Sequence, residues 1–130
     1  NSFGGNPVSC AVGKSVLEVI ENNKLQENAL IVGKYFLNKL ERIRKKNRKF
    51  ISEVRGRGLF IGIDIIKNSN QLKPNKQLAK KIINFMRDQG ILLSTDGPYN
   101  NVIKIKPPMV FNKENVDKVC ENLDYFFRKI

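Results

Sequence analysis

Apolar residues recur at helical spacing in four stretches of this chain, and several have a recognisable start or stop. Asn6 and Asn112 precede two of the stretches, and asparagine caps the free backbone N–H groups at a helix start. Pro7 is tolerated at the first helical position, and Gly90 is suited to end the third stretch. The pattern predicts helices over residues 7–22, 24–47, 75–89 and 113–130.

Shorter runs of β-branched residues lie between these helices and predict strands. Residues 59–66 are a nearly continuous apolar run, which is typical of a central strand. Before it, residues 50–54 are expected to be a short extended entry. RGRG at 55–58 is expected to be a turn, because glycine adopts backbone angles that other residues avoid. The predicted strands span residues 59–66, 91–94 and 102–105, and two prolines end the last one.

The order of these elements predicts the fold class. Helices at both ends surround the strands, which favours a small, largely antiparallel sheet with helices packed on it, an α+β arrangement. The segments show no repeat and no long linker, so residues 1–130 are expected to form one domain. Strand alternation should place Ile61, Ile63 and Ile65 on one face, and Phe60, Gly62, Asp64 and Ile66 on the other.

Composition excludes several kinds of chemistry. The chain has no histidine, which argues against a structural zinc site and against a nucleophile activated by histidine. Cys10 and Cys120 are too few for a disulfide framework, and both are expected to be small buried apolar residues. No apolar run is long enough for a membrane span, and no secretion signal is present. An intracellular location, cytoplasmic or mitochondrial, is expected.

The net charge of +12 leaves several alternatives open. It is compatible with nucleic acid, an acidic membrane surface or anionic substrates. It is also compatible with codon bias, because Lys, Asn and Ile are abundant together. KLERIRKKNRKF (residues 39–50) is the main feature in favour of a small basic nucleic-acid-binding module. Aromatic side chains are scarce around it, so a solvated helix face is favoured, and no specific nucleic-acid or membrane partner is expected.

Two strings carry a more specific signal: NSFGGNPVSCAVG (residues 1–13) and NVIKIKPPMVF (residues 101–111). A Gly-Gly pair before a capped helix is itself an anion-binding shape, although a common one. The wider strings resemble the class III aminotransferases, and the resemblance runs the full length of the chain. It implies the C-terminal small domain of a fold-type I enzyme that uses pyridoxal 5'-phosphate (PLP) in its complete form. It also implies a homodimer with the active site at the subunit interface.

The resemblance assigns a cofactor role to Ser2. In that family a threonine hydroxyl before the aromatic residue and the two glycines reaches the PLP phosphate of the neighbouring subunit. Ser2 stands at that place and keeps the hydroxyl donor, although it lacks the stiffening methyl group. VRGRGLFIGIDI (residues 54–65) resembles the family's entry into its first C-terminal strand. There Arg55 is available for an acidic partner or a domain interface, and a structural role is favoured.

Lys104 is the candidate substrate-binding residue. Class III aminotransferases often have an arginine there that forks onto the substrate's carboxylate. Lysine is a point charge and cannot make the same planar fork. ILLSTDGPYNNVIKIKPPMVF (residues 91–111) most resembles the branch of ethanolamine-phosphate and phosphohydroxylysine phospho-lyases, which eliminate phosphate rather than transfer the amine. A phospho-lyase acting on a phosphorylated amine is therefore expected. The alternative is a true amino-acid:keto-acid transaminase.

No catalytic residue is assigned within this chain. PLP enzymes need a lysine that binds the cofactor and an acidic residue facing its ring nitrogen. In this family both precede the glycine segment. None of the lysines here stands in that context, so the isolated chain is expected to be inactive. A stand-alone interaction domain that has lost catalysis also remains open.

The excess positive charge should produce only non-specific binding of polyanions. Short DNA should bind weakly, and its affinity should fall steeply with salt, because binding depends on release of counterions. Fluorescence anisotropy at two salt concentrations with two unrelated sequences checks this. Tight binding at physiological salt with a clear sequence preference would favour the nucleic-acid module instead.

Overall fold

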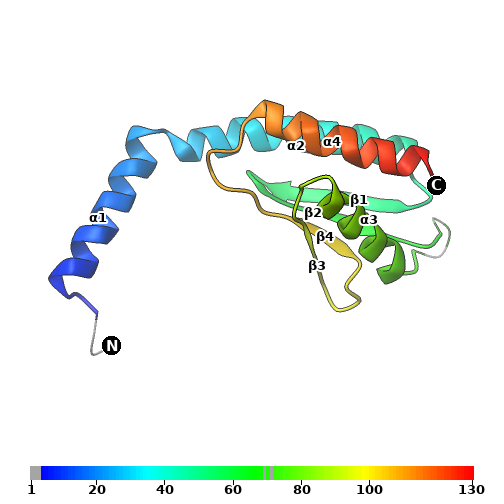
Figure 1. The fold of residues 1–130 in the computed structure, drawn as a ribbon, viewed down its shortest axis with the longest axis horizontal. Helices are drawn as coiled ribbons and strands as arrows, with labels where there is room; N and C mark the ends of the chain where they lie inside the picture. The colour runs from blue at the N-terminus through cyan, green and yellow to red at the C-terminus, as the bar shows by residue number, and fades with distance from the viewer. Residues whose placement is uncertain (1–3, 69, 71) are drawn as a thin grey trace.

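The computed structural model describes residues 4–68, 70 and 72–130, so Ser2 lies outside the described residues. Within them, four strands form one antiparallel sheet in the order β1-β2-β4-β3. This confirms the α+β class, with helices α2 and α4 lying over the sheet (Figure 1). The elements are α1 (Pro7–Asn22), α2 (Leu25–Lys46), β1 (Ile51–Arg57), β2 (Phe60–Ile65), α3 (Lys76–Asp88), β3 (Ser94–Asp96), β4 (Val102–Ile105) and α4 (Lys113–Arg128).

The core lies between one face of the sheet and helices α2, α3 and α4. The predicted alternation in β2 is confirmed, because Ile61, Ile63 and Ile65 are all buried in this layer. Gly62 and Asp64 point to the opposite, uncovered face and are only half-buried. Ile66 is buried as well, since it lies beyond the strand end and pairs with Pro74 of the following loop. Helices α2, α3 and α4 each contribute an apolar stripe to this single cluster.

Asparagine side chains cap three helix starts, as two of them were predicted to do. The Asn6 side chain accepts a hydrogen bond from the Ser9 backbone N–H at 2.9 Å. Asn112 and Asn115 form a reciprocal capping box at the start of α4. Asn75 caps α3 in the same way as Asn6 caps α1. Backbone N–H groups that would otherwise lack partners are satisfied, which sets these boundaries from local sequence.

The predicted turn at 55–58 is wrong. Strand β1 continues to Arg57, and only Gly58 and Leu59 form the turn to β2. Gly58 has φ +56°, which is the left-handed conformation that glycine tolerates. Arg55 pairs instead with Gly62 across the β1–β2 ladder. Sequence pattern indicated an extended segment only at residues 50–54. It missed the second half of the strand because the outward residues are charged and two positions near the turn are occupied by glycine and arginine.

The strand predicted at 91–94 is also displaced. Ile91 and Leu93 pack against the core beside α3 without joining the sheet. Pairing with β4 begins at Ser94, opposite Lys104, and β3 ends at Asp96. The apolar residues that suggested a strand therefore serve packing, while the polar residues after them make the ladder. The strand predicted at 102–105 is confirmed.

Helix α1 departs from the prediction that helices from both ends cover the sheet. The helix itself is confirmed, but it has no buried residue and projects away from the sheet (Figure 1). Val8, Val12 and Val16 are 73%, 59% and 52% exposed, so its apolar stripe is largely open to solvent. Cys10 lies on this helix and is exposed, which corrects its expected burial, whereas Cys120 is buried in α4.

Helix α2 lies directly on the β1–β2 turn through two glycines. A Cβ atom built on Gly33 would lie 2.1 Å from the backbone oxygen of Gly58. Real side-chain atoms do not approach so closely, so Gly33 sets the distance between α2 and the hairpin.

Gly33→Ala should therefore lower the free energy of unfolding by about 1–3 kcal/mol, the usual cost of overpacking. Gly13→Ala is the matched control, because Gly13 is also helical and a Cβ there meets nothing within 4 Å. It should leave stability unchanged or raise it by up to about 1 kcal/mol through helix propensity. Urea unfolding followed by circular dichroism measures both, and equal effects would contradict the proposed contact.

Candidate functional site

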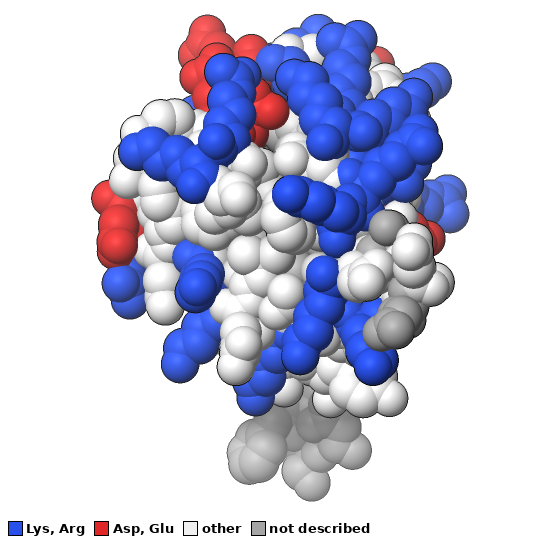
Figure 2. Space-filling model, turned by 90° about the vertical axis from the view of Figure 1, so that its right-hand side faces the viewer, with Lys and Arg blue, Asp and Glu red and all other residues white. Residues whose placement is uncertain are grey.

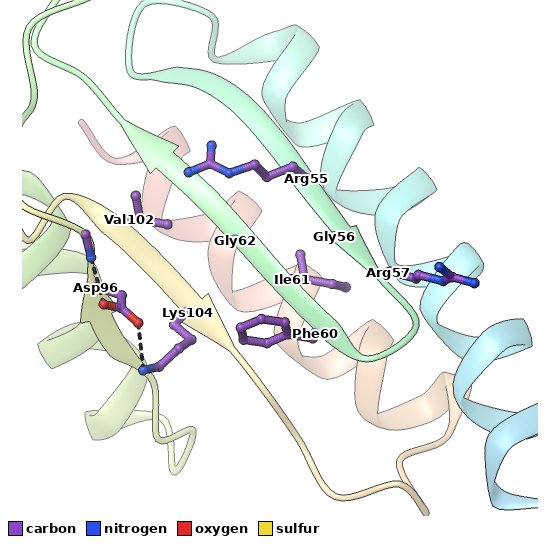
Figure 3. A pocket seen from close by; sticks show the side chains of 10 residues that line it. Arg55, Gly56, Arg57, Phe60, Ile61, Gly62, Asp96, Val102 and Lys104 are labelled. Carbon is purple, nitrogen blue, oxygen red and sulfur yellow. Dashed lines mark hydrogen bonds and ion pairs between the residues drawn. The ribbon is translucent and has the colours of Figure 1, made fainter.

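The uncovered face of the sheet carries a groove of about 570 Å³, which we call the sheet groove. All four strands contribute to it, and no helix of the described chain lies over it (Figure 3). Its lining combines cations, one carboxylate, glycines and apolar side chains: Arg55, Gly56, Arg57, Phe60, Ile61, Gly62, Asp96, Gly97, Val102 and Lys104.

Strand register places the polar residues of the groove in rows across the sheet. Arg55, Gly62, Lys104 and Ser94 are successive partners from β1 to β3. Directly paired residues of antiparallel strands point to the same side, so this row faces the groove. Because Gly62 has no side chain, the row is hollow at its centre, between the two cations.

Lys104 forms an ion pair with Asp96 across β4 and β3. The Lys104 Nζ to Asp96 Oδ2 distance is 2.9 Å, and the Asp96 carboxylate also accepts from the Gly97 backbone N–H at 2.8 Å. The Lys104 ammonium, and after it the Gly97 N–H, hold the pKa of Asp96 below its ordinary value. Both side chains remain partly exposed, at 36% for Lys104 and 59% for Asp96, so this pair is accessible to a ligand.

Arg55 is held on the other side of the hollow by two carboxylates. Its Nη1 lies 2.7 Å from Glu53 Oε2 and 3.8 Å from Asp64 Oδ2. Asp64 is in turn fixed by the side-chain amide of the buried Asn101. The structure thus provides the acidic partner that the sequence suggested for Arg55, and brings Arg55 and Lys104 to one groove.

Phe60 forms an apolar rim on the groove. The residue is 59% exposed, and Lys106 Nζ lies 5.8 Å from its ring centroid. Arg57, although it lines the groove, directs its side chain away from Arg55 and Lys104 (Figure 3). Sequence reasoning missed Asp96 and Gly62 as site residues. The sequence showed which face of β2 Gly62 occupies. It did not show which residues of β1 and β4 lie beside Gly62, because these depend on strand register.

Basic side chains gather at another part of the surface, seen in Figure 2. Part of residues 39–50 forms the C-terminal turn of α2, where Arg44, Lys45 and Lys46 complement the negative end of the helix dipole. Arg44 pairs with Glu41 at 2.6 Å. Phe50 is only half-buried but stacks on Phe127 of the core, so it is engaged in packing. These contacts favour a charged helix face over a nucleic-acid site.

Other classes of site are not present in the part of the chain that the structure describes. No helix there is long and apolar enough to cross a membrane. No three His, Cys, Asp or Glu side chains of those residues are grouped so that they could hold a metal ion. Burial raises the pKa of the Cys120 thiol to about 12, so Cys120 remains a protonated, unreactive thiol.

Comparison with known proteins decides the family. A model of the family Aminotransferase class-III matches residues 1–127. The chain belongs to the class III aminotransferase family. It is 45% identical over 119 residues to alanine–glyoxylate aminotransferase 2-like of Drosophila melanogaster, covering 91% of this chain and 24% of that protein. It is 40% identical over 125 residues to ethanolamine-phosphate phospho-lyase homolog 1 of Caenorhabditis elegans, covering 95% and 27%.

A solved structure is similar over nearly the whole chain. A phospholyase from Arthrobacter in complex with phosphoethanolamine superposes with a TM-score of 0.92 at 40% identity, covering 98% of this chain and 30% of that one. The chain thus spans about a quarter to a third of the proteins that it matches. The family implies PLP as the cofactor of the complete enzyme. Ser2, the residue assigned to that cofactor by resemblance, lies outside the described residues.

The ion pair in the sheet groove can be tested by titration. In Lys104→Ala the pKa of Asp96 should rise toward its ordinary value but stay below it, because the Gly97 N–H still favours the carboxylate. The stabilising contribution of Asp96 exists above its ordinary pKa and is lost as pH falls through the folded value. In the variant this contribution should be smaller, and its loss should be complete at a higher pH, because the folded pKa is closer to the ordinary value. Carboxylate-detected NMR measures the shift.

Arg87→Ala is the control for this titration, since Arg87 pairs with Asp88 rather than with Asp96. It should leave the Asp96 pKa unchanged. An Asp96 pKa that does not move in Lys104→Ala would contradict the ion pair in solution.

Proposed function

We propose that residues 1–130 are the C-terminal small domain of a PLP-dependent phospho-lyase that acts on a phosphorylated amine. The observation that carries this proposal is Lys104, a cation within an open groove. By the resemblance described above, it stands at the place of the carboxylate-forking arginine of class III aminotransferases. The similarity to the Arthrobacter phospholyase, whose structure contains phosphoethanolamine, supports the same substrate class.

The chemistry of lysine fits this substrate. An arginine fork matches the two coplanar oxygens of a carboxylate. The lysine ammonium has no planar preference, and it can meet a tetrahedral phosphate from any side. A charge-assisted contact of this kind contributes roughly 1.5–3 kcal/mol. In the complete enzyme, Lys104 would bind and orient the phosphate of the substrate.

The remaining parts of the enzyme lie outside the described chain. When bound, PLP supplies an electron sink for breaking bonds near the amine. We propose that Ser2 contributes a hydroxyl donor to the cofactor phosphate of the neighbouring subunit in a homodimer. The described residues hold no role in the chemical step beyond binding substrate, so the isolated chain would be inactive.

A transaminase is the second candidate. It is favoured by the 45% identity to the alanine–glyoxylate aminotransferase 2-like protein, which exceeds the identity to the phospho-lyase homolog. Both relatives cover the groove strands, so the two candidates differ in what Lys104 holds: a phosphate in the first and a carboxylate in the second.

Lys104→Ala in the complete enzyme should lower kcat/KM for ethanolamine phosphate by roughly ten- to a hundred-fold, at about 1.4 kcal/mol per decade. PLP retention should barely change, and Lys104→Arg should improve use of an amino acid relative to a phosphorylated amine. Lys76→Ala removes an exposed lysine of α3, away from the sheet groove, and serves as the charge-matched control.

The measurement is steady-state phosphate release from ethanolamine phosphate, beside transamination of alanine with a keto acid. Rapid transamination without phosphate release would reject the phospho-lyase and favour the transaminase. An unchanged rate in Lys104→Ala would reject the role of Lys104 alone.

A further inference from the structure

Gly62 occupies the centre of the sheet groove, between two cations. Its partner on β1 is Arg55, and its partner on β4 is Lys104. Adjacent strands lie about 4.8 Å apart, so the two cationic residues start about 10 Å apart with a bare backbone between them. Their long side chains can converge above Gly62 from opposite sides.

Each cation is paired with a carboxylate, and Figure 3 shows the pair of Lys104 with Asp96. Arg55 is paired with Glu53 at 2.7 Å, and Lys104 with Asp96 at 2.9 Å. Glu53 and Asp96 are 57% and 59% exposed, so each carboxylate would be rehydrated when its partner leaves. Exposed ion pairs of this kind hold their partners weakly and exchange readily.

A ligand in the hollow must attract the two cations more strongly than a single carboxylate does. A phosphate dianion has two charges and oxygens on every side, so it can accept from Arg55 and Lys104 at once. A carboxylate has one charge and two oxygens on one side, and would compete with Asp96 or Glu53 on equal terms. The arrangement therefore favours the dianion.

We infer that Gly62 is the floor of a phosphate seat whose two walls are Arg55 and Lys104. The ligand class is a phosphate monoester dianion. This inference rests on the proposed function for the identity of the substrate and goes beyond it in two residues. Arg55 binds the phosphate in addition to Lys104. The absence of a side chain at Gly62 allows the phosphate to lie on the sheet.

Arg55→Gln in the PLP-saturated complete enzyme tests the arginine wall. It should raise KM for ethanolamine phosphate, and the dissociation constant of inorganic phosphate, each about ten-fold, while kcat changes less than about three-fold. Arg42→Gln removes the same charge from the exposed side of α2 and should change neither value. Arg57→Gln, whose side chain points away from the hollow, should weaken phosphate binding no more than about three-fold through long-range attraction.

Isothermal titration calorimetry with inorganic phosphate at constant ionic strength gives the dissociation constants. Equal effects of Arg55→Gln and Arg57→Gln on the phosphate dissociation constant would overturn the seat. Arg55 would then act only through long-range attraction and not through a direct contact.

Gly62→Ala tests the floor. The added Cβ would lie 3.2 Å from Val102 Cγ1, so the sheet must adjust by only a few tenths of an ångström. The methyl group should raise the phosphate dissociation constant several-fold, because it would keep the phosphate from lying on the sheet between Arg55 and Lys104. The double variant Gly62→Ala, Val102→Ala relieves that contact and should remain equally impaired. Restored phosphate binding in the double variant would overturn the floor, since the defect would then come from packing.

The two proposals fail in different ways. If the enzyme releases no phosphate from ethanolamine phosphate but binds inorganic phosphate in an Arg55- and Gly62-dependent manner, the phospho-lyase is rejected and the seat stands. If phosphate is released and neither Arg55→Gln nor Gly62→Ala weakens phosphate binding, the seat is rejected and the phospho-lyase stands.

Discussion

Burial of alternate residues of β2 is the constraint on which the rest of this structure depends. Ile61, Ile63 and Ile65 point into the layer of helices, and each is at most 2% exposed. Because side chains alternate along a strand, this burial forces Gly62 and Asp64 onto the uncovered face. A slip of one residue would place isoleucines in water and an aspartate in the core. The core therefore determines which residues form the floor of the sheet groove.

The uncovered face carries charge pairs rather than a packed apolar layer. Arg55 lies against Glu53 and Asp64, and Lys104 lies against Asp96. Pairs that remain open to solvent contribute little to folding, so they can exchange partners at low cost. This is the property that a binding site needs. The same charges in the core would be expensive to hold and would not be available to a ligand.

Membership of the class III aminotransferase family explains features that the isolated fold leaves open. Helix α1 exposes Val8, Val12 and Val16, although stable surfaces seldom present an apolar stripe to water. The relatives are three to four times as long as this chain, which therefore corresponds to only part of each relative. The groove is likewise open on one side, which suits a site whose other wall comes from elsewhere in the complete enzyme.

The sequence by itself determined the helices, the central strand and the family, because these depend on local patterns. Asparagine caps at Asn6 and Asn112 and the alternation in β2 are properties of a few neighbouring residues. The sequence also singled out Lys104 through resemblance. It found only the first half of β1, as an extended segment at residues 50–54, and it did not find the start of β3 at Ser94. Both strands exist because β2 and β4 offer them backbone partners, which no local window contains.

Only the tertiary structure decided which residues share the site. Arg55, Gly62, Lys104 and Asp96 come from four strands, and their order in the chain says nothing of their distance. Their meeting depends on strand order and register, and both of these follow from fitting one apolar face beneath three helices. Local sequence sets what each residue can do, whereas packing over long separations sets which residues act together.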